Sequence, residues 1–144
     1  MALLLITVLV YLPVTKHAFV FDDQAVIKDA EIVQNWRNYP HLFSRQYFPL
    51  SRELSYRPVA TLSHMLDQAL FPNRPGAFHL TNLLLHLAVL AAVWWLSVRL
   101  FGNRITALLP PLMLAWHPAL SEPVNAVSFR EDLLAALAGV FALR

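Results

Sequence analysis

The sequence predicts an all-α membrane protein with several transmembrane helices. Of its 144 residues, 58% are hydrophobic and 14% are charged, against roughly 45–50% and about 25% in soluble domains. The apolar residues are concentrated in separate runs, and one of them, residues 78–98, contains no charged residue. So little polar or basic surface excludes a disordered chain, a coiled coil and a nucleic-acid-binding module. We therefore expect the lipid bilayer, and no nucleic acid, as a partner.

We predict four membrane spans, at approximately 2–15, 77–98, 105–117 and 132–144. The second span is the clearest, because residues 78–98 at 1.5 Å per residue cover the roughly 30 Å of a hydrocarbon core. Trp94 and Trp95, followed by Arg99, mark its end. Such a sequence is typical of the headgroup boundary of a bilayer.

The other spans are shorter. The first run, Ala2 to Val14, has no basic stretch before it and no small-residue cleavage site after it, which favours a membrane helix over a signal peptide. Ile105 to Trp116 contains two prolines and covers about 18 Å, so it either spans with flanking residues or re-enters as a broken helix. We expect it to span.

The fourth apolar run begins near Leu133 and continues to the last residue without a helix stop signal. This ending predicts that residues 1–144 are the N-terminal fragment of a larger membrane module. Cysteine is absent from the sequence, which excludes a disulfide framework and a thiolate metal site within this stretch.

Residues 16–75 form a long amphipathic loop between the first two spans. Apolar spacing predicts two helices in it, at about 30–43 and 58–71. The short loop 99–104 carries two arginines and no acid, which places it in the cytoplasm under the positive-inside rule. The long loop is then extracytoplasmic, as is the polar stretch from 117 to 132.

Asp22 and Asp23 follow the first span. Two adjacent carboxylates repel each other and suit a general base or a ligand of a divalent cation. A solvated turn or a helix cap is the alternative. No metal is identified by the sequence; if there is one, these two aspartates are its expected ligands.

His117, Glu122 and Arg130 lie around the third and fourth apolar segments. Ionisable groups near membrane depth are candidates for function, although Arg130 can also pair with the acidic residues that follow it at a helix start. Arg57 stands before Pro58, at the expected beginning of a helix. A guanidinium at that position suits a phosphate, and an ordinary surface arginine is the alternative.

His79, Asn82 and His86 share one face of the second span. Their spacing does not place both imidazole rings on one metal ion as an i, i+4 pair would. We expect these side chains to form hydrogen bonds between helices.

Four of these segments, taken in order, resemble the N-terminal part of the polytopic GT-C glycosyltransferases. The closest subgroup is the transmembrane and tetratricopeptide-repeat proteins, which are O-mannosyltransferase-like. The segments are Phe19-Val20-Phe21-Asp22-Asp23, Tyr56-Arg57-Pro58-Val59, residues 78–86 (FHLTNLLLH), and His117-Pro118 with Glu122 and Arg130-Glu131-Asp132-Leu133-Leu134.

The resemblance implies a multi-pass protein of the bacterial inner membrane or endoplasmic reticulum. It implies transfer of a sugar from a polyprenyl-phosphate donor to an extracytoplasmic protein or glycan acceptor. An aspartate of the first outer loop then acts at the reaction centre, which corresponds to Asp22 or Asp23, with Glu122 as a further acidic candidate. Charge and position favour Arg57, His117 and Arg130 for substrate binding. Some relatives need a divalent cation and others do not, so the resemblance does not decide whether this protein binds one. We expect the fragment alone to be inactive.

Two other functions fit the same residues. In a polytopic transporter or channel, Asp22, Asp23 and Glu122 would line a path for ions or protons. In a non-catalytic membrane scaffold, these carboxylates would have no chemical role.

Overall fold

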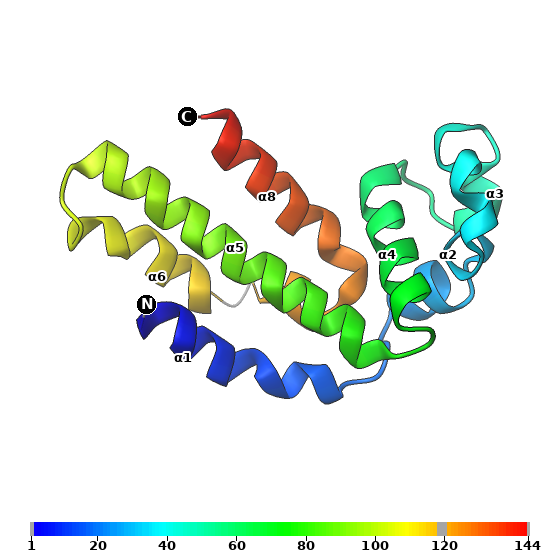
Figure 1. Ribbon diagram of the computed structural model, residues 1–144, viewed down its shortest axis with the longest axis horizontal. Helices are drawn as coiled ribbons and strands as arrows, with labels where there is room; N and C mark the ends of the chain where they lie inside the picture. Colours follow the sequence, from blue (N-terminus) through cyan, green and yellow to red (C-terminus); the bar gives the residue numbers. More distant parts are fainter. Residues whose placement is uncertain (1, 118–120, 144) are drawn as a thin grey trace.

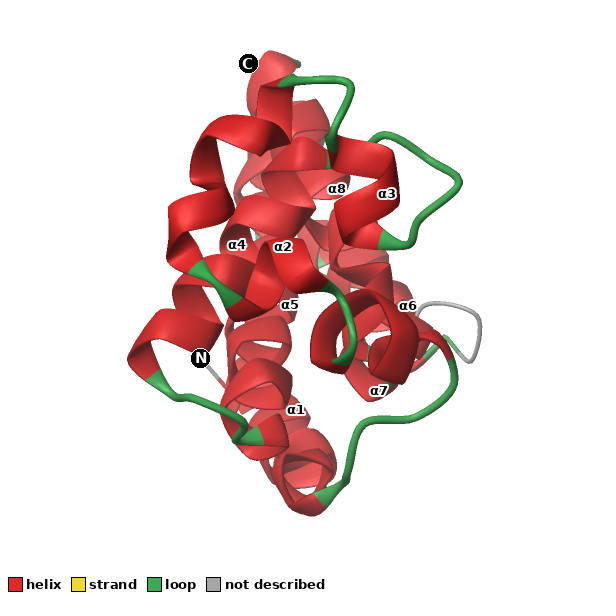
Figure 2. Ribbon diagram, turned by 90° about the vertical axis from the view of Figure 1, so that its right-hand side faces the viewer, coloured by secondary structure: helices red, strands yellow, loops and turns green. Residues whose placement is uncertain are grey.

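The chain is helical through the part that the structure describes. The computed structural model describes residues 2–117 and 121–143, and these ranges contain helices and loops but no strand (Figure 2). The all-α prediction is confirmed. Figure 1 shows several helices lying along a central one, α5 (Pro75–Phe101), and a compact group of helices around α4 (Pro58–Leu70) at one end.

Helix α5 (Pro75–Phe101) is the axis of the molecule. Its 27 residues extend over about 40 Å, and within the described ranges it alone has the length and apolar composition of a membrane span. Pro75 stands in the first turn, where a missing N–H costs nothing. Gly102 ends the helix in the left-handed conformation (φ 65°), and its N–H donates to the Val98 carbonyl at 3.0 Å. The helix therefore begins two residues before and ends three residues after the predicted span at 77–98.

Shorter helices pack along α5 (Figure 1). They are α1 (Ala2–Tyr11), continued by the 3-10 turn η1 (Leu12–Lys16); the 3-10 turn η4 (Thr106–Leu108) with α6 (Leu109–Trp116); α7 (Glu122–Asn125) with the 3-10 turn η6 (Val127–Phe129); and α8 (Arg130–Ala142). Together η4 and α6 cover about 18 Å, less than half of the length of α5. The four-span topology stays a prediction.

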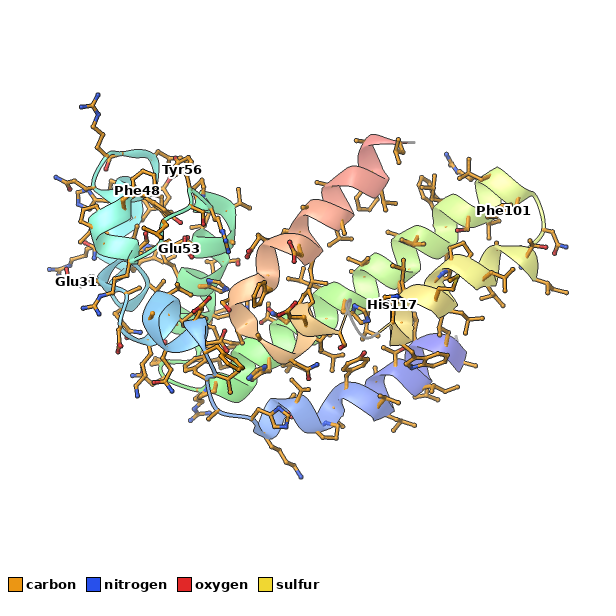
Figure 3. All side chains as sticks on the ribbon, turned by 180° about the vertical axis from the view of Figure 1, so that it is seen from behind. Glu31, Phe48, Glu53, Tyr56, Phe101 and His117 are labelled. Atoms are coloured by element: carbon orange, nitrogen blue, oxygen red, sulfur yellow. The ribbon has the colours of Figure 1, made fainter. Side chains whose placement is uncertain are left out.

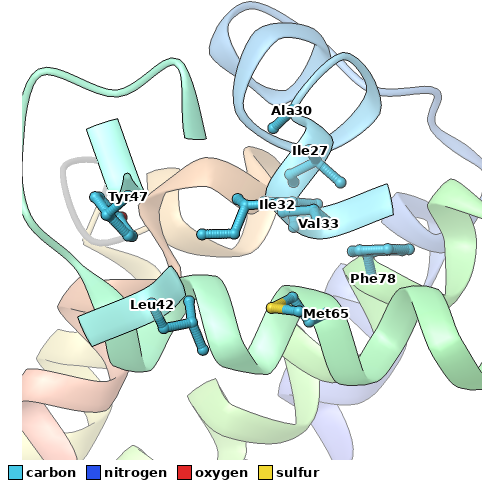
Figure 4. Close-up of a cluster of buried hydrophobic side chains, with 9 residues drawn as sticks. Ile27, Ala30, Ile32, Val33, Leu42, Tyr47, Met65 and Phe78 are labelled. Atoms are coloured by element: carbon cyan, nitrogen blue, oxygen red, sulfur yellow. The ribbon is translucent and has the colours of Figure 1, made fainter. Parts of the chain in front are cut away.

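The predicted long loop is itself folded. It contains a π-helical turn η2 (Gln24–Lys28), α2 (Glu31–Gln34), a 3-10 helix η3 (Trp36–Phe43), α3 (Tyr47–Ser51) and α4 (Pro58–Leu70). These elements share a buried hydrophobic core (Figure 4). Phe78 from α5 and Val127 from η6 belong to the same core. The compact group is therefore anchored to the long helices by apolar burial.

One predicted helix is divided. The segment 30–43 breaks at Asn35, which is extended (φ −130°, ψ 112°) and whose side chain accepts a hydrogen bond from the N–H of Arg37 at 3.0 Å. A short polar side chain that bonds to nearby backbone competes with a continuous helix. By contrast, α4 matches the helix predicted at 58–71 almost residue for residue.

Candidate active site

A pocket of about 310 Å³ gathers charged side chains between the compact group and the segment before α8. Its polar lining includes Asp22, Arg52, Glu53, Arg57 and Ser128. The fold therefore brings together Asp22 and Arg57, which the sequence analysis selected separately. Glu53 and Arg52 were not among the predicted site residues.

The two adjacent aspartates have different surroundings. Asp22 is exposed and faces the pocket. Asp23 is fully buried, and both of its carboxylate oxygens accept backbone hydrogen bonds, Oδ1 from the N–H of Ser128 at 2.7 Å and Oδ2 from that of Val20 at 3.2 Å. Asp23 thus fastens the start of the compact group to the segment before α8, while Asp22 remains accessible from solvent.

Arg57 stands immediately before α4 and forms an ion pair with Glu131 of α8. The side chains are 37% and 25% exposed, respectively, so solvent can reach the pair. Arg57 also lines a second cavity, an apolar groove of about 380 Å³ between α4 and α8. The guanidinium therefore lies where the charged pocket and the apolar groove meet.

The hydroxyl of Tyr47 holds Glu53 and the backbone of Arg57 together. It donates to Glu53 Oε2 at 2.5 Å, accepts the N–H of Arg57 at 3.2 Å and lies 2.8 Å from Thr61 Oγ1. Burial raises the pKa of Tyr47 to about 12, so the hydroxyl keeps its proton. Burial also raises the pKa of the Glu53 carboxyl. Figure 3 labels Glu53 with Phe48 and Tyr56 at this end of the molecule.

Arg130 is completely buried and is not part of the pocket lining. Its Nη2 lies 2.6 Å from Asp67 Oδ2 and also donates to the Phe78 carbonyl, while Nε donates to Asn82 Oδ1 at 2.6 Å. The Asn82 amide in turn donates to the Pro123 carbonyl at 2.6 Å. For Asn82, the predicted hydrogen bonds between helices are present.

His117 and Glu122 lie apart from the pocket lining. Both are exposed; His117 follows α6 and Glu122 begins α7. Figure 3 labels His117 near the middle of the molecule, well away from Glu53. Within residues 2–117 and 121–143 no group of three or more His, Asp or Glu side chains could hold a metal ion. A divalent cation bound by Asp22 and Asp23 stays a prediction.

Comparison with curated proteins finds relatives along most of the chain. Protein O-mannosyl-transferase TMTC2 of Mus musculus is 31% identical over 132 residues, which cover 88% of this chain and 16% of the relative. The same protein of Homo sapiens gives the same identity and coverage. Over most of its length, the chain is homologous to the TMTC protein O-mannosyl-transferases. The resemblance drawn from the sequence motifs is thereby confirmed.

Other TMTC proteins are similar to the chain at comparable identity. Human TMTC3 is 31% identical over 124 residues, and human TMTC1 is 36% identical over 84 residues, or 58% of this chain. The chain spans about a sixth or less of the length of these TMTC relatives. No family model matches the chain, and no solved structure matches it.

Proposed function

We propose that this chain is part of a membrane glycosyltransferase that moves a sugar from a polyprenyl-phosphate donor to a protein hydroxyl. The observation that carries the proposal is the 310 Å³ pocket, in which the accessible carboxylate of Asp22 and the guanidinium of Arg57 border one space. Relatives named protein O-mannosyl-transferases support mannose as the sugar and a protein as the acceptor.

The reaction needs a base for the acceptor and a cation for the leaving group. Asp22 takes the proton from the hydroxyl as its oxygen bonds to the anomeric carbon. The bond from that carbon to the phosphate oxygen breaks, and its electron pair stays on the phosphate. Arg57 binds the phosphate oxygens and stabilises their charge. A single displacement of this kind inverts the anomeric configuration.

The neighbouring residues position these two groups. Tyr47 holds the backbone N–H of Arg57, so the start of α4 is fixed under the pocket. Arg130 fixes the start of α8, and the next residue, Glu131, reaches Arg57. We assign Arg130 this supporting role. Contacts of His117 and Glu122 with the acceptor remain part of the proposal.

The arrangement along α5 supports an extracytoplasmic site. Figure 3 labels Phe101 at one end of the molecule and Glu53 at the other. The intervening helix is long enough to cross a bilayer. If the loop at 99–104 is cytoplasmic, as its two arginines predict, the pocket lies on the opposite side. We therefore propose that it faces the lumen of the endoplasmic reticulum or the bacterial periplasm.

The test measures transfer of radiolabelled mannose from polyprenyl-phosphate mannose to a peptide rich in serine and threonine. The full-length protein encoded by its gene is assayed in membranes. The double variant Asp22→Asn with Glu53→Gln removes two carboxylates from the pocket, and we expect transfer to fall at least ~100-fold. Asp29→Asn with Glu31→Gln is the matched control, because both side chains are exposed and lie outside the pocket lining.

Two results would contradict the proposal. If the wild-type protein transfers no mannose but moves ions in a flux assay that the pocket variant abolishes, the protein is a transporter. If the pocket variant and the control transfer mannose at the wild-type rate, the pocket is not the catalytic site.

A further inference from the structure

The groove between α4 and α8 has walls of small apolar side chains. Pro58, Val59 and Ala60 line one side, and Leu134, Ala135 and Ala138 line the other. The last three residues recur at i, i+1 and i+4 of α8, so they share one strip of the helix surface. Because alanines form much of this strip, the two helices leave a channel of about 380 Å³ instead of closing on each other.

The polar end of this groove is formed by the Arg57–Glu131 ion pair. A guanidinium binds a phosphate through two parallel hydrogen bonds, in the same geometry that it uses for a carboxylate. Glu131 thus occupies the position that a phosphate would take. Because the Arg57–Glu131 pair is only partly buried, a phosphate that competes for the guanidinium can displace the carboxylate. A ligand with an anionic head group and an apolar tail would pair with the guanidinium of Arg57 and pack its tail against the apolar walls of the groove.

We propose that this groove binds the first isoprene units of the donor lipid, with the lipid phosphate replacing Glu131 at Arg57. The inference rests on the proposed function and names where its donor binds. A single channel beside the guanidinium fits a phosphate ester with one chain. A phospholipid has the same phosphate but carries two chains, and the second would lie outside the groove. With the phosphate at Arg57, the anomeric carbon extends into the pocket that Asp22 borders.

The test uses a polyprenyl phosphate without sugar, carrying a photoreactive diazirine on its first isoprene unit. The full-length protein in membranes is irradiated with this probe, and the labelled peptides are identified by mass spectrometry. We expect labelling in α4 and α8, competed by unlabelled polyprenyl phosphate but not by phosphatidic acid. Because the probe has no sugar to transfer, labelling is independent of catalysis.

Substitutions in the groove test whether the isoprene tail of the probe binds there. Ala138→Trp fills the groove, and we expect labelling to fall at least tenfold. Ala91→Trp is the matched control, since Ala91 is an exposed alanine of α5 outside the groove lining. If Ala138→Trp fails to fold, Ala135→Leu adds less volume and should give a smaller loss. Glu131→Gln removes the competing carboxylate and should give half-maximal labelling at about two- to fivefold lower probe concentration.

Each outcome decides the proposal. Wild-type labelling in a folded Ala138→Trp or Ala135→Leu variant would overturn the assignment of the groove, as would weaker labelling of Glu131→Gln. Equal competition by phosphatidic acid would make the groove a phospholipid site. If labelling is lost in Ala138→Trp but the wild type transfers no mannose, the groove still binds the lipid. In that case the proposed function, not the groove assignment, is overturned.

Discussion

Asp67 and Arg130 form a buried ion pair, with 2.6 Å between Oδ2 and Nη2. Asp67 belongs to α4 in the compact group and Arg130 begins α8, so the pair joins the two parts of the molecule. Thr81 of α5 donates to the other Asp67 oxygen at 2.9 Å. The pair therefore sets the separation of α4 and α8, which is also the width of the apolar groove.

Replacing Asp67 with asparagine should destabilise the protein strongly. The change leaves the fully buried Arg130 without its counter-charge, and breaking such a pair costs about 3–5 kcal/mol. Thermal unfolding in detergent should show a large drop in Tm. Asp29→Asn changes an exposed aspartate and should stay within about 0.5 kcal/mol of wild type. Equal melting of the two variants would refute the structural role of the pair.

Replacing two glycines with alanine should change the stability of the protein in opposite directions. A Cβ on Gly76 would clash with the Thr15 carbonyl oxygen, so Gly76→Ala must push α5 from η1 at a cost of about 1–3 kcal/mol. A Cβ on Gly139 would meet no atom within 4 Å. Gly139→Ala in the last turn of α8 should stabilise by about 0.5–1 kcal/mol. Tm values of both variants test this, and a stabilising Gly76→Ala would mean that α5 does not approach η1 so closely.

Removing the Tyr47 hydroxyl should weaken both stability and donor binding. Tyr47→Phe leaves the Arg57 N–H and Glu53 Oε2 without this partner, which costs about 1–3 kcal/mol. The displaced Arg57 should raise the KM for the lipid donor more than it lowers kcat. Tyr39→Phe is the control, because Tyr39 is 46% exposed. A Tyr47→Phe variant with unchanged KM and Tm would argue against the positioning role.

Glu53 should make stability depend on pH. Burial raises its pKa in the folded protein above the usual value of 4.5. The neutral form is therefore favoured by folding, and this contribution is fully present below about pH 4.5 and is lost as the pH rises through the folded pKa. Glu53→Gln keeps a neutral side chain, so its Tm relative to wild type should rise between pH 4 and pH 7. A difference that falls over this range would contradict the burial of Glu53.

The sequence predicted a helix correctly where a helix start and a long apolar pattern occur together. Helices α4 and α5 each begin at a proline and carry a long apolar pattern, and both lie close to their predicted positions. The predicted helix at 30–43 failed at Asn35, where a side-chain hydrogen bond to the backbone of Arg37 competes with the helix. Apolar spacing alone does not reveal such competition.

The site was predictable only in part, because its geometry comes from distant elements. Asp22 and Arg57 were identified from their neighbours in the sequence. Glu53 has no local motif, and its surroundings depend on Tyr47, to which it is hydrogen-bonded. Similarly, no sequence pattern reveals that Arg130 is buried, since its partners come from α4 and α5.

The central claim is that Asp22 reacts while its neighbour Asp23 holds the fold, and a comparison of Asp22→Asn with Asp23→Asn tests it most directly. Mannose transfer per folded protein and Tm are measured for both. We predict that Asp22→Asn keeps the wild-type Tm and loses transfer at least ~100-fold. Asp23→Asn should lose about 1–3 kcal/mol of stability, because one of its two backbone hydrogen bonds is broken, yet its folded fraction should still transfer mannose. Wild-type transfer by Asp22→Asn, or equal loss of transfer in folded Asp23→Asn, would contradict the claim.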